Sequence, residues 1–404
     1  MRLTEQEQAM LNGEFGPGFA RAMRVLVGIG KAFGAQRMVP ISRGHISLSN
    51  QEGDLWFVSQ MLEEGAHCRV PPTVNPAYDY EYFKTVSQLD GENERILKST
   101  IDVYRKLGAV LTFDCTPFFE NNVPRFGEIC SFSASGGAVY VNSVLGARSN
   151  REAAQSAMCA AITGVTPEYG LLLKENRAGD VLIRVEADAA TEYDYELLGY
   201  CTPKKMGQAY HQPVFEGLSP QTTAEQLMNL GTQLNVHGIV PMFHVAGVTP
   251  EAPDVETAFQ GRKDYPVVTV TDEDLAQARR EISAGAGKAD FCILGCPHLT
   301  IGQVGSIAAM LEGQKLAGQL YIFTSTSTRE LARRMGYLDV IHAAGGEIVI
   351  NSCVDQPCWS HLNGMSGVTE SPKCAYYTKR WNMAFTVKSI PACIQSVLKG
   401  EIVE

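Results

Sequence analysis

The fold is decided by the stretch KADFCILGCPHLTIGQVGSIAAMLEGQKLAGQLYIFTST at residues 288–326, together with GEIVINSC at 346–353. Its apolar runs ADFCILGC, QLYIFTST and GEIVINSC have the length of buried strands. Between them, residues 300–313 and 328–345 have the length and the apolar spacing of helices. Strands that alternate with helices are typical of βαβ units, in which helices cover both faces of a parallel sheet. We therefore predict an α/β fold with mostly parallel sheets.

The same alternation extends towards the N-terminus. Beyond residue 220 we expect a helix over 223–236, a strand over 238–247 and a helix over 271–283. In the less regular first half we expect a strand over 108–115, a helix over 151–164 and a strand over 180–188. A chain of 404 residues is longer than one domain usually is. Because the stretch from Cys201 to Pro220 is polar and contains prolines, we predict two α/β domains, over residues 1–205 and 206–404.

Composition and charge argue against several classes of partner. The formal net charge is −10 and no run of Lys or Arg occurs, so the chain lacks the basic face that nucleic-acid binding requires. No window approaches the roughly 18 consecutive apolar residues of a membrane span, and the N-terminus lacks the pattern of a secretory signal. We expect a cytoplasmic protein with a small-molecule substrate. The 11 cysteines are odd in number and scattered, which favours reduced thiols.

Three cysteines occupy matching places in the sequence. Cys115, Cys296 and Cys353 each end an apolar run, and open α/β sheets bind ligands outside the carboxyl ends of their strands. Three thiolates without a fourth protein ligand suit an iron–sulfur cluster with one open iron position, and zinc is an alternative. An open iron acts as a Lewis acid on a substrate hydroxyl, which favours a hydro-lyase. Cysteine is also common as plain packing, the role that we expect for Cys159 and Cys292.

Polar residues near these cysteines are candidates for the rest of the site. The loop after Cys115 contains Thr116 and Glu120, and such loops often carry substrate-contacting groups. The segment NSVLGARSNRE at 142–152 leads into the expected helix that starts near Arg151. Its two arginines and the helix N-terminus favour an anion site, and the alternative is ordinary capping with solvated arginines.

The remaining candidates are two histidines and a lysine. His298, directly after Cys296 and Pro297, is placed to act as an acid or a base, and Lys373 can bind an anionic substrate group. The predicted catalytic residues are Glu120, Ser143 and His298. The predicted substrate-binding residues are His45, Thr116, Asn142, Arg148, Arg151 and Lys373.

Several longer motifs resemble those of one family. DCTPFFENNVP at 114–124, NSVLGARSNRE at 142–152, ILGCPHLT at 293–300 and SPKCAYY at 371–377 are similar to the large subunit of the aconitase X family, a branch of the aconitase superfamily. The resemblance runs from the N-terminus to the C-terminus in the family's order. It implies an aconitase-like fold of several α/β domains, with the active site between domains at the carboxyl ends of strands.

The resemblance also implies a reaction and what the reaction requires. Members of the family are iron–sulfur dehydratases whose cluster is held by three cysteines, which match Cys115, Cys296 and Cys353 here. They dehydrate cis-3-hydroxy-L-proline or mevalonate 5-phosphate, and the former is our first predicted substrate. A small swivelling domain closes their site. Because nothing in these residues resembles that domain, the family resemblance implies a separate small subunit as partner.

One stretch, GEICSFSASG at 127–136, departs from the family pattern. Where the family has His, Trp, Glu and Ser, this chain has Ile129, Phe132, Ala134 and Gly136. The loss of an imidazole and a carboxylate near the active site either shifts the substrate or removes a proton carrier. The sequence therefore leaves a second class open, a non-catalytic paralogue that keeps the fold and a structural metal site.

Overall fold

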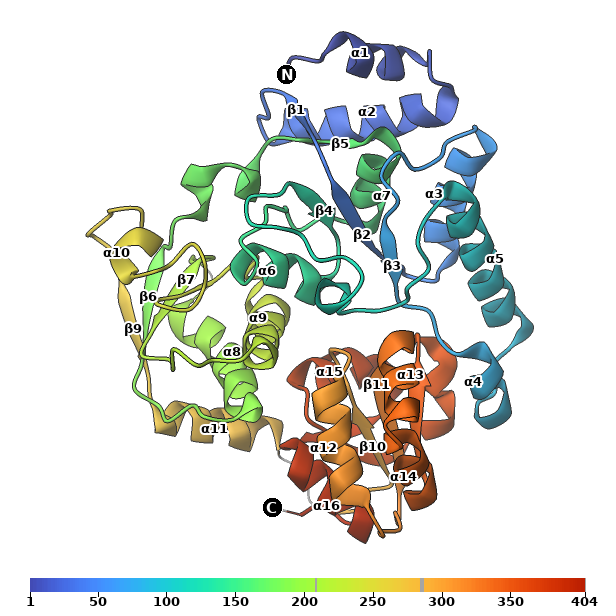
Figure 1. Cartoon of the computed structure of the whole chain (residues 1–404), viewed down its shortest axis with the longest axis vertical. Helices are drawn as coiled ribbons and strands as arrows, with labels where there is room; N and C mark the ends of the chain where they lie inside the picture. The colour runs from blue at the N-terminus through green and yellow to red at the C-terminus, as the bar shows by residue number, and fades with distance from the viewer. Residues whose placement is uncertain (208, 284–286, 404) are drawn as a thin grey trace.

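The computed structural model describes residues 1–207, 209–283 and 287–403 of the chain. Their strands form parallel sheets of three, four and five strands and one antiparallel pair, β1 with β5. In Figure 1 the three sheets lie in separate parts of the molecule, each with its own helices. The predicted class, α/β with mostly parallel sheets, is confirmed. Within the described residues, no helix combines the length and the apolar character that crossing a membrane requires.

The five-stranded sheet is built largely from the stretch quoted first. Its strands are parallel and have the order β12-β11-β10-β13-β14. On β10, Phe291 and Ile293 pack in the core shared with the N-terminal part, whereas Cys292 and Leu294 pack with the helices of the other face. The elements are β10 (Phe291–Leu294), α12 (Ile301–Leu311), β11 (Gln319–Thr324), α13 (Thr326–Arg334), α14 (Tyr337–Ala344), β12 (Gly346–Ile350), η4 (Pro357–Leu362), β13 (Ser366–Thr369), α15 (Pro372–Tyr377), η5 (Thr378–Trp381), β14 (Ala384–Val387) and α16 (Ile390–Lys399).

Two glycines shape this part of the chain. The helix predicted over 328–345 is in fact two helices, because Gly336 has a φ of 78° and separates α13 from α14. Gly295 has a φ of 107°, and a Cβ at this position would lie 2.3 Å from the carbonyl oxygen of Phe323. Only glycine therefore allows the turn that leads from β10 to Cys296.

The four-stranded sheet is also parallel and has the order β8-β7-β6-β9. It crosses the domain boundary expected near residue 205, since β6 precedes that residue and its partners follow it; residue 208 lies outside the described residues. The strand predicted over 238–247 forms only at two residues, because Pro241 has no N–H to donate to a ladder. The elements are η2 (Gly170–Leu172), η3 (Lys174–Arg177), β6 (Val181–Val185), α8 (Glu192–Met206), β7 (Pro213–Glu216), α9 (Ala224–Gly238), β8 (His244–Val245), α10 (Val255–Ala258), β9 (Val267–Val270) and α11 (Asp272–Ile282).

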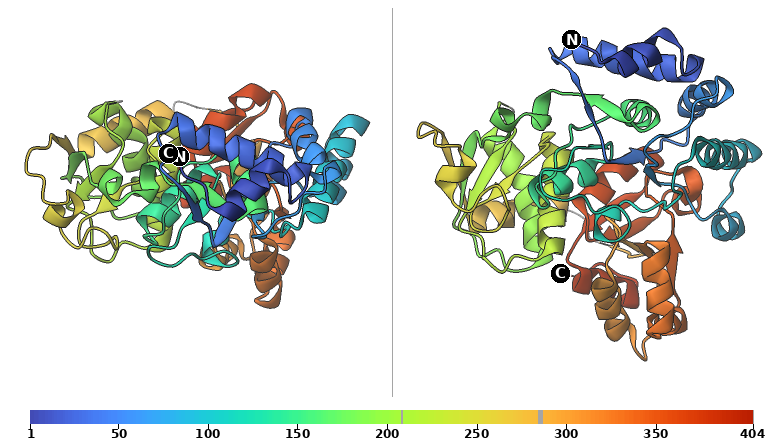
Figure 2. Two further views of the ribbon diagram at one scale, coloured as in Figure 1. Left: turned by 90° about the horizontal axis from the view of Figure 1, so that it is seen from above. Right: turned by 45° about the horizontal axis from the view of Figure 1, so that its top comes forward.

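The N-terminal part holds the three-stranded sheet, in the order β3-β2-β4. Its first two helices lie across one end of the molecule, as both views of Figure 2 show. The elements are α1 (Glu5–Asn12), α2 (Pro17–Ala32), β1 (Met38–Pro40), β2 (Arg43–Ser47), α3 (Glu52–Glu63), β3 (Thr73–Asn75), α4 (Tyr80–Val86), α5 (Gly91–Leu107), η1 (Pro117–Phe119), β4 (Cys130–Phe132), α6 (Ser135–Ser143), α7 (Ala154–Thr163) and β5 (Val165–Pro167).

Two sequence predictions are wrong in this part. The strand expected over 108–115 makes only an isolated bridge from Val110 to Thr73, and Phe113 has a φ of 48°. The helix expected to start near Arg151 begins at Ala154, because Arg151 is still extended and forms a bridge with Phe132. Both corrections change which backbone groups lie near the cysteines.

Candidate active site

Cys115, Cys296 and Cys353 line one cavity of about 140 Å³, which we call the cysteine cavity. Cys296 follows β10 and Cys353 follows β12, so both lie beyond the carboxyl ends of strands in the five-stranded sheet. Cys115 does not end a strand and comes from the loop between α5 and η1 in the N-terminal part. The structure thus brings the three thiols together where two parts of the chain meet.

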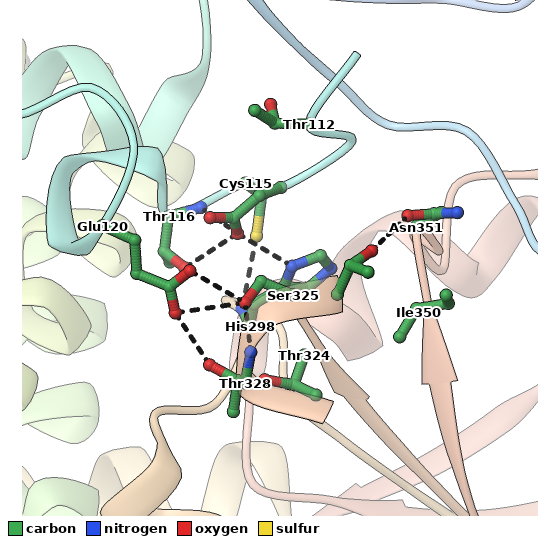
Figure 3. Close-up of polar contacts among 12 residues, drawn as sticks. Thr112, Cys115, Thr116, Glu120, His298, Thr324, Ser325, Thr328, Ile350 and Asn351 are labelled. Atoms are coloured by element: carbon green, nitrogen blue, oxygen red, sulfur yellow. Dashed lines mark hydrogen bonds and ion pairs between the residues drawn. The ribbon is translucent and has the colours of Figure 1, made fainter. Parts of the chain in front are cut away.

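His298 and Asp114 tie these two parts together below the thiols (Figure 3). The backbone N–H of His298 donates to Sγ of Cys115 at 3.2 Å, and its ring nitrogen Nδ1 lies 3.0 Å from Oδ1 of Asp114. The other ring nitrogen, Nε2, donates to the carbonyl oxygen of Ser352 at 3.0 Å. Burial raises the pKa of Asp114, but its hydrogen bonds from His298 and Thr116 outweigh burial and hold the pKa below the ordinary value. The imidazole is therefore fixed on both sides.

Asp114, Cys115 and His298 also form a group that could hold a metal ion, since their ligand atoms all lie within 4.8 Å of one another. In this structure, however, both ring nitrogens of His298 already have partners within the protein. The sulfurs of Cys115, Cys296 and Cys353 do not form such a close group among the described residues. The three thiols are therefore spaced more widely than ligands of one ion.

Lys373 in α15 is the cationic side chain that lines the cysteine cavity. Burial lowers its pKa, but the thiols of Cys296, Cys115 and Cys353 act in the opposite direction, and the net effect is a raised pKa. Conversely, burial raises the pKa of Cys115 to about 12, and Lys373 opposes that rise. The ammonium group thus lies close to all three sulfurs and stays charged.

Other cysteines of the chain do not line this cavity. Cys159 and Cys292 are 0% exposed, as expected for core residues. Cys130 lies in β4, and its Sγ donates to the carbonyl oxygen of Arg148 at 3.7 Å. Cys358 and Cys374 are buried in η4 and α15. Convergence on the cavity separates Cys115, Cys296 and Cys353 from these buried thiols.

Thr116 and Glu120 serve the loop and a neighbouring helix instead of lining the cavity. The N–H and the hydroxyl of Thr116 donate to Oδ1 of Asp114 at 2.9 and 3.0 Å. Glu120 accepts hydrogen bonds from Ser325, Ser327 and Thr328 at the N-terminus of α13, with a distance of 2.8 Å from the Thr328 hydroxyl (Figure 3). Glu120 therefore joins the loop after Cys115 to the five-stranded part.

The polar residues of the segment 142–151 mostly build a buried network. Asn142 accepts from Arg177 at 3.0 Å, and Ser143 accepts from the N–H of Phe243 at 2.9 Å. Arg148 donates to the carbonyl oxygen of Leu172 at 2.9 Å. The structure does not bring these three predicted site residues to the cysteine cavity.

Arg151 and His45 lie nearer to it. Burial raises the pKa of Tyr377, which lines the cavity, and the charges of Lys373 and Arg151 oppose that rise. The exposed guanidinium of Arg151 is thus close to Tyr377. His45 in β2 is fully buried beneath the cavity, with Nδ1 2.8 Å from the Thr73 hydroxyl. Burial lowers the pKa of His45 to about 4, which keeps its ring neutral at pH 7.

Several cavity residues were not among the sequence candidates. Asn75, Asp355 and Tyr377 line the cavity beside the cysteines. Ala134 and Gly136 also line it, so the stretch that departs from the family pattern reaches the candidate site. That departure was the one sequence signal that pointed to this part of the wall.

Comparisons with known proteins match the whole length of the chain. Family models for the aconitase X first, second and third domains match residues 1–175, 179–280 and 289–399. The chain belongs to the aconitase X family. The crystal structure of the holo-form of aconitase X from Thermococcus kodakaraensis superimposes with a TM-score of 0.88 at 32% identity, over 98% of this chain and 100% of that one.

Two of the similar curated proteins are dehydratases. The phosphomevalonate dehydratase large subunit of Thermococcus kodakarensis is 33% identical over 404 residues, which cover 98% of this chain and 99% of the relative. The cis-3-hydroxy-L-proline dehydratase of Pseudomonas aeruginosa is 34% identical over 390 residues, or 93% of this chain and 66% of the relative. For this aconitase X chain, the predicted reaction class, a hydro-lyase, is confirmed by these relatives.

Proposed function

We propose that the chain is the large subunit of an iron–sulfur dehydratase and that Cys115, Cys296 and Cys353 hold the cluster. The observation that carries this proposal is the convergence of the three thiols, from two parts of the chain, on one cavity that also contains Lys373. The names of its relatives support the reaction. A second class, a non-catalytic paralogue with a structural metal, fits this convergence less well because the cavity also contains charged side chains.

The spacing of the thiols favours a cluster over zinc. Three thiolates on one tetrahedral zinc ion, each with a bond of about 2.3 Å, would lie roughly 3.8 Å from one another. The three sulfurs are not among the described groups whose ligand atoms all lie within 4.8 Å. Thiolates on different irons of one cluster are spaced more widely, so the donor set fits an iron–sulfur cluster. When bound, an iron with an open position would supply Lewis acidity at the substrate hydroxyl.

The side chains of the cavity can bind and orient a charged substrate. Lys373 is placed to bind a carboxylate next to the reacting carbon, and Asp355 lines the same cavity. A wall with one positive and one negative side chain matches a zwitterionic amino acid. We therefore keep cis-3-hydroxy-L-proline as the first substrate.

We assign His298 a positioning role in place of the predicted acid–base role. Its ring already bonds to Asp114 and to Ser352, and its backbone holds Cys115. Glu120 likewise acts by holding α13. The proton acceptor would then come from the second subunit, in keeping with relatives named as large subunits.

Mevalonate 5-phosphate is the second candidate substrate, for a specific reason. The chain spans 99% of the phosphomevalonate dehydratase large subunit but only 66% of the Pseudomonas cis-3-hydroxy-L-proline dehydratase. The chain thus matches the two-chain arrangement of the former. Arg151, near Tyr377, would supply a second cation for a phosphate.

The test is a substrate comparison with the anaerobically purified complex of the chain and a small subunit of the family. Water loss from cis-3-hydroxy-L-proline and from mevalonate 5-phosphate is followed side by side. Turnover of the former, or of the latter, decides between the two substrates. If neither substrate nor other small hydroxy acids react with an iron-loaded complex, the dehydratase proposal is wrong and the structural-metal class stands.

A further inference from the structure

A second cavity, of about 330 Å³, lies on the other side of Pro297 from the cysteines. It lies between α8 and α9 of the four-stranded part and α12 and α16 of the five-stranded part. Three carboxyl groups line it, those of Glu192, Glu196 and Glu370, and we call it the glutamate cavity. Among the described residues that line it, none has a positively charged side chain.

The three carboxyls come from two elements and have different partners. Glu192 and Glu196 lie one turn apart on α8, and Oε2 of Glu192 accepts from Gln303 at 2.5 Å. Glu370 follows β13, and its Oε1 accepts from the N–H of Gly295 at 2.6 Å. Glu196 is only 2% exposed, and its Oε2 has no hydrogen-bond partner.

A buried carboxyl oxygen without a partner is costly and calls for an explanation. Burial, and then the nearby carboxylates of Glu370 and Glu192, raise the pKa of Glu196 well above its ordinary value. A positive charge in the cavity would remove both the repulsion among the carboxyls and the unmet hydrogen bond. The chemistry of the wall therefore favours a cationic hydrogen-bond donor.

The geometry distinguishes an organic cation from a metal ion. Among the described residues, the three glutamates do not form a group whose ligand oxygens all lie within 4.8 Å of one another, so they are too far apart to chelate one ion. The rest of the wall is largely apolar, with Met228, Leu299, Met310 and Ile390. A ligand with an alkyl body and ammonium groups satisfies both features, because its N–H donors can reach separate carboxylates.

We propose that the glutamate cavity binds a small alkylammonium or alkyldiammonium compound, with Glu196 as the residue that receives its charged end. Pro297 belongs to the walls of both cavities, so such a ligand contacts the segment that carries Cys296. The proposal does not depend on the dehydratase activity or on a cluster, because it uses none of the cysteines.

Isothermal titration calorimetry of the complex of the chain and its small subunit tests the proposal, with 1,4-diaminobutane, n-butylamine and 1-butanol as probes. We expect saturable binding of the diamine at one site per chain, and weaker or no binding of the uncharged alcohol. Glu196→Gln should weaken the binding of the diamine about tenfold, because it removes a charge-assisted hydrogen bond. Glu256→Gln, at an exposed glutamate of α10, is the matched control and should bind as the wild type does.

A second variant tests the cavity without changing a carboxyl. Ser306 is exposed on α12 at the edge of the cavity, and Ser306→Trp should fill part of the cavity and abolish binding while the protein stays folded. Absence of saturable binding of both amines overturns the proposal. So does unchanged affinity for the diamine in Ser306→Trp, or in a folded Glu196→Gln protein.

Discussion

The backbone N–H of His298 donates a hydrogen bond of 3.2 Å to Sγ of Cys115, although 183 positions separate the two residues. This contact joins the loop after β10 to the loop before η1. An N–H directed at sulfur favours the thiolate form, and the imidazole of the same residue is fixed by Asp114 and Ser352. The position of Cys115 therefore depends on the packing of two parts of the chain against each other.

Asp114→Asn should destabilise this junction. The carboxylate accepts from Thr116 and contacts the ring of His298, and it is 1% exposed. We expect the free energy of unfolding, measured in urea, to fall by about 1–3 kcal/mol, because a buried charged acceptor is lost. Asp264→Asn, at an exposed aspartate, should leave it unchanged. Equal stability of the two variants would mean that the pair contributes nothing.

Lys373→Met should remove substrate binding but leave the metal content intact. Because the ammonium lies beside all three thiols and the cavity, its loss should lower kcat/KM about 100-fold or more, with iron per chain unchanged. Lys379→Met is the control at a nearby exposed lysine. Wild-type kinetics in Lys373→Met would contradict a substrate contact at this residue.

His45 should make stability depend on pH. Burial lowers its pKa from 6.5 to about 4 in the folded chain, so between these values the unfolded chain binds more protons and stability falls as the pH falls. From pH 7 to pH 4 the wild type should therefore lose about 3 kcal/mol more than His45→Gln does. His211→Gln, at an exposed histidine, should retain the wild-type dependence. Parallel curves for wild type and His45→Gln would disprove the prediction.

Glu120→Gln distinguishes a structural role from a catalytic one. The carboxylate accepts from the hydroxyls at the start of α13, so its loss should cost about 1 kcal/mol of stability and change kcat by less than about threefold. Chemical denaturation and steady-state kinetics on the same preparation provide both values. A fall in kcat of more than about 100-fold at unchanged stability would restore the catalytic role predicted from the sequence.

Local pattern was sufficient for most of the C-terminal part. Strands β10, β11 and β12 and helix α12 lie where short apolar runs and helical spacing placed them. The pattern did not mark the break between α13 and α14, because it depends on the φ of one residue, Gly336. It also failed at 108–115, where an apolar run lacks a neighbouring strand to form a ladder and makes one bridge only.

The site was predictable only in part, for a related reason. Cys115, Cys296 and Cys353 stand at the ends of apolar runs, and this pattern is visible in the sequence. Asn142 resembled a site residue because it is polar and precedes a helix, but it bonds to Arg177, which is 1% exposed. That partner is 35 positions away, and spacing along the chain does not reveal such a contact.

The most direct test of the account is the iron and sulfide content of the anaerobically purified complex, with its visible absorption, in four variants and the wild type. Cys115→Ser, Cys296→Ser and Cys353→Ser should each lose most of the iron, the sulfide and the visible absorption. Cys130→Ser, at a buried thiol outside the cysteine cavity, should retain all three. A wild-type complex without iron and sulfide, or full cluster content in any of the three cavity variants, would contradict the proposed ligands.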